Sequence, residues 1–225
     1  MKGFVVGTRF FEKDESKVEK SLADLRTFCR NAWQAGAEHV FVAVNEAANV
    51  FGALEMGTPD AVTIFPVKPW GHFVQPLNAL LLMGRGYWGQ GHYFLSASVT
   101  VKLTPQIALA LTTNVDDHTL VAGAAMEGHL FEEGCYHRYG PTAGRQVPWN
   151  TLALWNAEML WKHGGFPLLG DGPPAEPENA GVEEVATIAT VQGEMLKPGF
   201  KLALKKLEAE EWANVWAEKI QKFVK

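Results

Sequence analysis

The chain has 225 residues, 47% of them apolar, and a formal net charge of −5 at pH 7. This length and composition predict a single domain over residues 1–225 with a large core. Because the net charge is negative and no Lys/Arg cluster is present, we expect no nucleic acid partner. No apolar run is long enough to cross a bilayer, and the first residues lack a signal-peptide pattern. We therefore expect no membrane span and a cytoplasmic location.

Strand and helix patterns alternate through the first half of the chain. Short apolar runs predict strands at 3–8, 38–44, 60–65 and 92–98. A first helix is predicted to begin at Ser16, which forms a capping box with Glu19 and is followed by an apolar stripe that ends at Trp33. Two more helices are predicted at 48–56 and 73–83. Strands that alternate with helices pair in parallel through crossovers that cover both sheet faces. The predicted fold class is an α/β three-layer sandwich with a mostly parallel central sheet.

The second half is less regular. Thr104 and Pro105 begin a helix, a strand follows at 119–126, and residues 127–147 read as a long loop. Asn150 is predicted to cap a helix over 151–163 that ends at a Gly pair, and another helix spans 182–196. The amphipathic end of the chain predicts a C-terminal helix, assigned to 198–225.

Polar residues follow several of the predicted strands. In open α/β sheets, ligands bind beyond the carboxyl ends of the strands. We therefore expect a substrate pocket there, near Thr8, Arg9, Asn45, Ser96 and Ser98. Each has a simpler explanation too: the serines can be the polar end of a strand, and Asn45 can cap a following helix.

The order of these elements resembles that of the GT-A glycosyltransferases, which have the nucleotide-diphospho-sugar transferase fold. The resemblance covers residues 3–197, with three local marks: a helix that contains Asn78, the GGF turn at 164–166, and the pair Glu183–Glu184. It implies a nucleotide-binding half at 1–103, an acceptor half at 104–197, and a nucleotide sugar and an unknown acceptor as partners. It also implies an acid near the acceptor that can act as a base.

Glu183 and Glu184 are the residues that match this acid, and Asn78 is a candidate substrate contact. Successive helical residues differ by about 100°, so the two acids cannot both face a pocket. The resemblance favours Glu183, which matches the family's first acid. Acids in a first helical turn are also stabilised by the helix dipole without any catalytic role.

The chain departs from the family where Asp-x-Asp usually binds a divalent metal, because Ser96-Ala97-Ser98 stands there. Serine does not hold a hard divalent ion as a carboxylate does. We expect no metal site, although Mg²⁺ or Mn²⁺ stays open as a cofactor. The cation that stabilises a departing diphosphate would then come from an arginine: Arg9, Arg85, Arg138 or Arg145.

Other clusters are weaker candidates. One of Trp149, Trp155 and Trp161 could line a sugar or base pocket, and Trp149 is our candidate. Asp116 and Asp117 are explained by turn chemistry. A zinc site built on His129, Cys135 and His137 matches no common ligand spacing.

Two functions remain ahead of an unrelated α/β enzyme. The first is a glycosyltransferase that uses a nucleotide-diphosphate sugar, without need of a metal. The alternative is a catalytically inactive nucleotide- or sugar-binding protein of the same fold. The sequence leaves the oligomeric state open.

Overall fold

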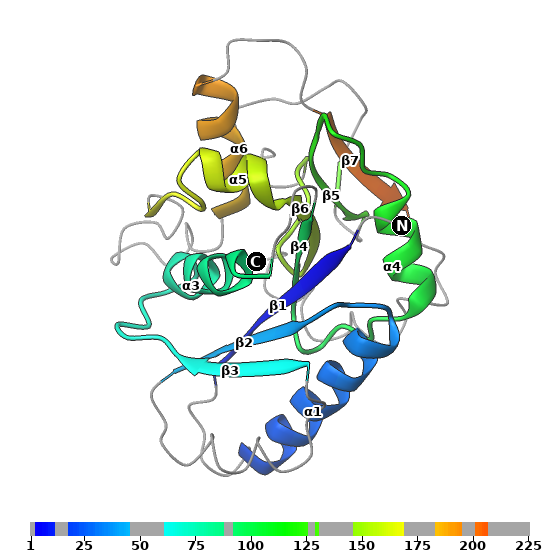
Figure 1. Cartoon of the computed structure of the whole chain (residues 1–225). Coiled ribbons are helices and arrows are strands. Elements are labelled where there is room, and N and C mark those ends of the chain that lie inside the picture. The colour runs from blue at the N-terminus through cyan, green and yellow to red at the C-terminus, as the bar shows by residue number, and fades with distance from the viewer. Residues whose placement is uncertain are drawn as a thin grey trace.

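The computed structural model describes residues 3–11, 18–45, 61–87, 92–125, 129–130, 146–168, 183–194 and 201–206 (Figure 1). All strands in these ranges belong to one seven-stranded sheet in the order β3-β2-β1-β4-β6-β5-β7. They are β1 (Phe4–Phe10), β2 (Val40–Val44), β3 (Val62–Pro66), β4 (Tyr93–Ala97), β5 (Thr119–Ala125), β6 (Leu152–Asn156) and β7 (Lys201–Lys206).

The sheet is mostly parallel, as expected. The pairs β1–β2, β2–β3, β1–β4 and β5–β7 are parallel, whereas β6 is antiparallel to both β4 and β5. The carboxyl ends of β1, β2 and β4 therefore lie at one edge of the sheet, and the beginning of β6 lies at that same edge, since Leu152 is level with Ala97.

Helices cover both faces of this sheet (Figure 1). On one face, α1 (Val18–Gln34) and α4 (Pro105–Thr112) pack on a core that includes Phe4 and Val6. On the other, α3 (Val74–Arg85), α5 (Ala157–Lys162) and α6 (Glu183–Glu194) pack on a core that includes Val5 and Phe94. The three-layer α/β sandwich predicted from the alternating pattern is confirmed.

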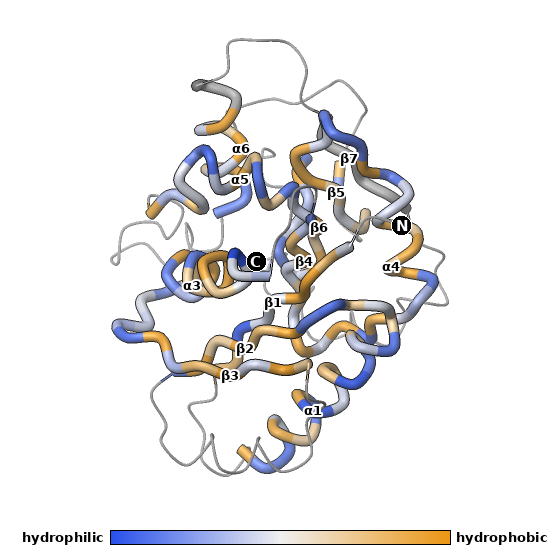
Figure 2. Tube along the Cα trace, viewed as in Figure 1, coloured by the Kyte–Doolittle hydropathy of each residue, from blue (hydrophilic) through white to orange (hydrophobic). Residues whose placement is uncertain are grey.

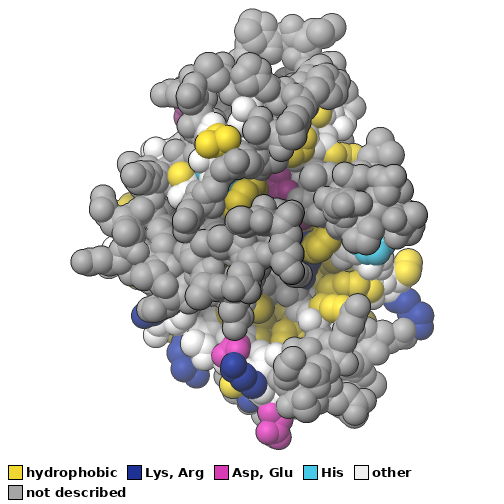
Figure 3. Space-filling model, turned by 180° about the vertical axis from the view of Figure 1, so that it is seen from behind, with side chains coloured by type: hydrophobic (Ala, Val, Ile, Leu, Met, Phe, Trp, Pro, Cys, Tyr) yellow, Lys and Arg dark blue, Asp and Glu magenta, His cyan; other side chains and the backbone are white. Residues whose placement is uncertain are grey.

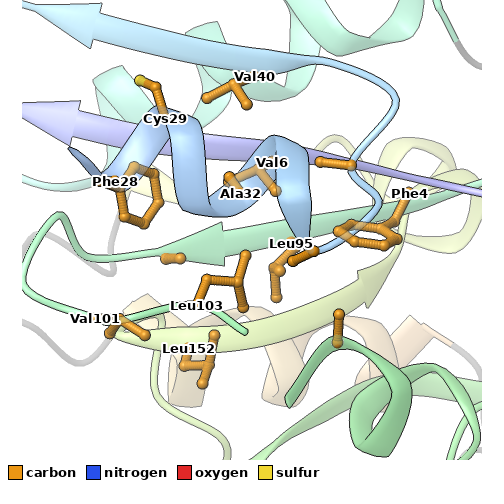
Figure 4. Close-up of a cluster of buried hydrophobic side chains, with 14 of the residues drawn as sticks. Phe4, Val6, Phe28, Cys29, Ala32, Val40, Leu95, Val101, Leu103 and Leu152 are labelled. Carbon is orange, nitrogen blue, oxygen red and sulfur yellow. The ribbon is translucent and has the colours of Figure 1, made fainter. Parts of the chain in front are cut away.

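Amphipathic helices and apolar strands explain these layers. Figure 2 shows hydrophobic residues along β1, β2 and β3, whereas α1 alternates hydrophobic and hydrophilic turns. In Figure 4, the side chains of Phe28, Cys29 and Ala32 on α1 lie against Val6 and Val40 of the sheet. Trp33, which we predicted to share this apolar stripe, is 53% exposed and lies off it.

The predicted helix over 151–163 is wrong in its first half. Residues 152–156 form β6, whose Leu154 and Trp155 are fully buried between β4 and β5. The helix α5 begins only at Ala157, and its cap is Asn156, whose side chain accepts the N–H of Met159. Gly164 and Gly165, both at positive φ, end the helix region as predicted.

The other end of the sheet also differs from expectation. The segment 198–225 was assigned to a C-terminal helix, but residues 201–206 form β7, paired with β5. The predicted helix at 48–56 and the helical stretch at 207–225 lie outside the described residues. The division into a nucleotide-binding half and an acceptor half stays a prediction.

Candidate functional site

Strand alternation decides which of the predicted edge residues face the same side. On β1, Val5 and Gly7 alternate with Val6 and Phe10, which belong to the core under α1. Arg9 therefore faces α3, and Thr8 faces α1. Ser96 alternates with Tyr93, Leu95 and Ala97 of the α1 core and shares the α3 face with Phe94. The structure thus brings Arg9 and Ser96 to one face and places Thr8 on the other.

Thr8 and Asn45 are the remaining edge residues of the prediction on these strands. The Thr8 hydroxyl is buried and has no hydrogen-bond partner among the described residues. Asn45 is half-buried and directly follows β2. Continuing the alternation of Phe41 and Ala43 places it on the α3 side, together with Arg9. A pocket on the α3 face would therefore include Asn45 and exclude Thr8.

Ser96 joins a buried polar network at the edge between β4 and β6. Its hydroxyl donates to the carbonyl oxygen of Asn150 at 3.0 Å. The side-chain oxygen of Asn150 accepts the indole N–H of Trp155 at 2.9 Å, and its backbone N–H donates to Oε1 of Glu184. This network links β4, the chain entering β6 and the start of α6.

Glu183 makes a different contact from Glu184. Its Oε1 lies 3.8 Å from Nη1 of Arg9, at the carboxyl end of β1. The same Arg9 nitrogen donates to the carbonyl oxygen of Phe73 at 3.3 Å, and the guanidinium lies over the Phe73 ring, 5.0 Å from its centroid. Arg9 therefore connects the start of α3 with the start of α6.

Both acids are buried, Glu183 being 3% exposed and Glu184 5%. Burial raises the pKa of Glu184 well above its usual range, and the neighbouring Glu183 carboxylate raises it further. The N–H of Asn150 and the charge of Arg9 oppose this pKa shift, but with smaller effect. Burial thus favours the protonated form of Glu184, while Glu183 has the cation Arg9 beside it.

The 96–98 position does not fit a divalent cation. The Ser96 hydroxyl is used by Asn150, and the Ser98 hydroxyl lies 3.0 Å from that of Thr100 in the turn after β4. Neutral hydroxyls bonded to the chain itself are poor ligands for Mg²⁺ or Mn²⁺. In the described residues, no group of three His, Cys, Asp or Glu side chains is placed to hold a metal ion.

Asn78 holds the GGF turn. Its side-chain amide donates to the carbonyl oxygen of Phe166, and its side-chain oxygen accepts the N–H of the same residue, both at 2.8 Å. A Cβ on Gly165 would lie 2.5 Å from that oxygen, so the turn needs glycine there. Phe166 in turn packs edge-on against Trp155, 5.3 Å between ring centroids. The predicted substrate contact for Asn78 stays a prediction, but its amide already serves the fold.

Arg85 does not join this site. It is exposed at the last turn of α3, about 17 Å along the helix axis from the end that Arg9 contacts. Its guanidinium lies over the ring of Trp161, 4.3 Å from the centroid. Arg138 and Arg145, the other candidate cations, lie outside the described residues.

Trp149 lies near the carboxyl edge, just before β6, and packs partly on the core under α1. Its ring is 4.1 Å from that of His129, whose Nε2 lies 2.9 Å from the carbonyl oxygen of Val147. Cys135 and His137 lie outside the described residues, so the zinc set stays untested. Asp116 accepts bonds from His118 and Thr119, which confirms its turn role.

Sequence reasoning missed two residues of this site. Asn150 was expected to cap a helix, and nothing in the pattern signals that it joins Ser96 to Glu184. Phe73 was predicted only as the start of a helix.

In the rear view of Figure 3, hydrophobic side chains reach the surface in the middle of the face. The large exposed apolar side chains include Phe11, Phe73, Leu82 and Leu168.

No family model matches the sequence, and no curated protein does either. Solved structures do match in fold. A mannosyltransferase from Pyrobaculum calidifontis, solved with GDP-Man and Mn²⁺, superposes with a TM-score of 0.57 at 13% identity. That match covers 91% of this chain and 55% of the mannosyltransferase chain, so this chain spans about half of that neighbour's length.

Shorter transferases match over nearly their whole length. A nucleotidyl transferase from Methanothermobacter thermautotrophicus has a TM-score of 0.54 at 14% identity, with 98% of this chain and 95% of that chain covered. The 4-diphosphocytidyl-2C-methyl-D-erythritol synthase from Anaerococcus prevotii has a TM-score of 0.54 at 5% identity, with 93% and 89% covered.

These likenesses define the fold class. The chain has the GT-A-like fold of nucleotide-diphospho-sugar transferases, as its element order and the GGF and acid-pair marks predicted. Identities this low establish the fold alone. Among the described helices, none has the length and apolar character to cross a membrane.

Proposed function

We propose that this protein is a glycosyltransferase that takes a nucleotide-diphosphate sugar, with Glu183 as its base. One observation carries this proposal: a buried acid at the start of α6 lies 3.8 Å from Arg9 at the carboxyl end of β1. That edge is where ligands bind in open α/β sheets. The fold, shared with glycosyltransferases and nucleotidyl transferases, supports a transferase.

The chemistry needs a base and a cation. A carboxylate within hydrogen-bond reach of the acceptor hydroxyl removes its proton as the bond to the sugar forms, which contributes on the order of 10²- to 10⁴-fold. Arg9, whose Nη1 lies 3.8 Å from Oε1 of Glu183, favours the ionised form of this acid. Its guanidinium has five N–H donors in a planar arrangement, so it can also donate to a phosphate oxygen of the departing diphosphate.

We propose that transfer proceeds without a divalent metal. The serines at 96–98 do not fit such an ion, and hydrogen bonds within the chain use both hydroxyls. If this is right, Mn²⁺ adds little to the affinity for a nucleoside diphosphate. Isothermal titration with Mn²⁺ and with a chelator measures the difference directly, and a strong Mn²⁺ dependence would contradict metal-independent transfer.

The test begins with ligand binding. A thermal-shift screen of nucleoside mono-, di- and triphosphates and nucleotide sugars finds ligands, because a ligand that binds only the folded state raises the melting temperature. The nucleotide sugar found is then used in a transfer assay with candidate acceptors. We expect Glu183→Gln to lower transfer at least 10²-fold while nucleotide binding is retained.

Glu158→Gln is the matched control, because Glu158 is an exposed acid paired with Lys162 on α5. It should leave both binding and transfer unchanged. Equal transfer rates for Glu183→Gln and the wild type would eliminate Glu183 as the base, and binding of triphosphates with release of pyrophosphate would indicate nucleotidyl transfer instead.

The second candidate is a binding protein without catalysis. It is favoured by the same serines, since the position implied for metal ligands is committed to the fold through Asn150 and Thr100. A protein that binds a nucleotide sugar in the screen, with equal affinity in wild type and Glu183→Gln, and turns over no acceptor would support this alternative.

A further inference from the structure

The two acids at the start of α6 are neighbours in sequence but point at different partners. Glu183 lies against Arg9 on β1. Glu184 accepts the backbone N–H of Asn150, in the chain that enters β6. The difference follows from the helix, because one residue turns the side chain by about 100°.

The pair is too deeply buried for both acids to be ionised. Each carboxyl is at least 95% buried, and carboxylates on adjacent residues repel strongly where water is excluded. Arg9 is the charged group that lies beside the pair from β1, and the neutral backbone N–H of Asn150 contacts it from the chain that enters β6. Arg9 carries one positive charge and so compensates one carboxylate. It lies on the Glu183 side.

Glu184 is also the point where α6 is attached to the sheet. Asn150 receives the Ser96 hydroxyl on its carbonyl and the Trp155 indole on its side chain, and it gives its N–H to Glu184. The strands β4 and β6 and the helix α6 are therefore all joined through Asn150. A shift of Glu184 away from Asn150 would rotate the first turn of α6 and with it Glu183.

We propose that Glu184 is a positioning residue that remains a neutral carboxylic acid, anchoring α6 to Asn150 so that Glu183, beside Arg9, carries the single negative charge of the pair. The catalytic part of this inference rests on the proposed function. The protonation of the pair does not, and it can be measured in a protein that transfers nothing.

Infrared difference spectroscopy of the full chain tests the protonation. At neutral pH the wild type should show a C=O stretching band of a protonated carboxylic acid, and Glu184→Gln should lose it. Glu183→Gln should keep the band but lose it at a lower pH than the wild type, because the neighbouring charge that favours the proton is gone. A band lost in Glu183→Gln and kept in Glu184→Gln would overturn the assignment, and so would a wild type with no band.

The pH profile of transfer tests the positioning. The wild type should lose kcat at alkaline pH, as Glu184 ionises beside Glu183, with little change in KM. Glu184→Gln, which keeps the shape and the hydrogen-bond acceptor, should retain kcat at neutral pH and lack the alkaline fall. Glu184→Leu, which removes the acceptor, should lower kcat at every pH. Equal kcat for the Gln and Leu variants would refute a positioning role.

The two measurements separate this inference from the function on which it rests. If the infrared bands behave as expected and no acceptor is turned over, the proposed transfer is wrong and the charge assignment stands. If transfer occurs but the alkaline fall persists in Glu184→Gln, the transferase stands and the inference about Glu184 is wrong.

Discussion

Glu183 and Glu184 show how two identical side chains acquire opposite properties. Glu183 lies beside a guanidinium, which favours its ionised form, whereas burial and the neighbouring Glu183 raise the pKa of Glu184 and favour its protonated form. Their burial is nearly the same, and Arg9 is the group that lies closer to Glu183. This contrast makes stability as well as chemistry depend on pH.

We expect the wild type to lose stability relative to Glu184→Gln as the pH rises. The pKa of Glu184 is raised in the folded state, so above about pH 4.3 the unfolded chain has released a proton that the folded chain still binds. In that window the free energy of unfolding falls by about 1.4 kcal/mol per pH unit, until the folded pKa is reached. The stabilisation is thus complete below the unfolded pKa and is lost above it.

Urea unfolding of both proteins at a series of pH values measures this difference. Glu158→Gln serves as the control, because its exposed carboxyl should leave the pH dependence of the wild type unchanged. Parallel curves for the wild type and Glu184→Gln would show that Glu184 ionises in the folded protein.

At this scale the sequence predicted part of the site. Motif order and strand ends indicate the acid pair and Arg9, and the structure places Glu183 beside Arg9, but their roles stay predictions. The grouping of Thr8 with Ser96 was not reliable, since a one-residue difference in register moves a side chain to the other sheet face. Arg85 was predicted as a site residue for another reason. The sequence shows that this residue is a cation near the end of a helix, but it does not show how far that end lies from Arg9.

Among the elements, β6 shows why a local pattern can mislead. The run TLALWNAEMLWKH is apolar with helix-forming residues throughout, and a short apolar run does not distinguish a buried strand from a buried helix. Tertiary contact decides the outcome: the backbone of residues 152–156 pairs with β4 and β5, Leu154 and Trp155 pack into the cores on opposite sheet faces, and the helix starts only after them. The strand β7 was not predicted because its alternating pattern is short and much of the segment is lysine.

The position of the α5 cap can be tested directly. Asn156→Ala removes the acceptor for the N–H of Met159 and should destabilise the protein by about 1 kcal/mol, whereas Asn156→Asp should retain most of the stability. Urea unfolding midpoints of the two variants provide the comparison. If both variants were equally stable, the side chain would not act as a cap.

For the whole molecule, the core under α1 offers a probe of cooperative opening. Cys29 is 1% exposed, and burial raises the pKa of its thiol to about 12. Only the thiolate reacts with a disulfide reagent, so near pH 8 the folded protein should be inert at this residue.

The experiment uses Cys135→Ser, which leaves Cys29 as the remaining cysteine. Labelling in native buffer should proceed at the rate of global unfolding, and labelling in strong denaturant should be immediate. Fast native labelling, with an opening free energy far below that from denaturant unfolding, would show that α1 separates from the sheet by itself.

The order of strands in the sheet has a consequence for how the chain assembles. β5 precedes β6 in sequence, yet β6 lies between β4 and β5. As the chain is synthesised, β3, β2, β1 and β4 can pair first, but the backbone donors of β4 stay open until residues 152–156 arrive. Until then β4 presents one unpaired edge and β5 presents two, because its other partner, β7, comes later still. A nascent chain halted before Leu152 would therefore be prone to aggregation; β6 closes the edge of β4 and one edge of β5, and β7 covers the other edge of β5.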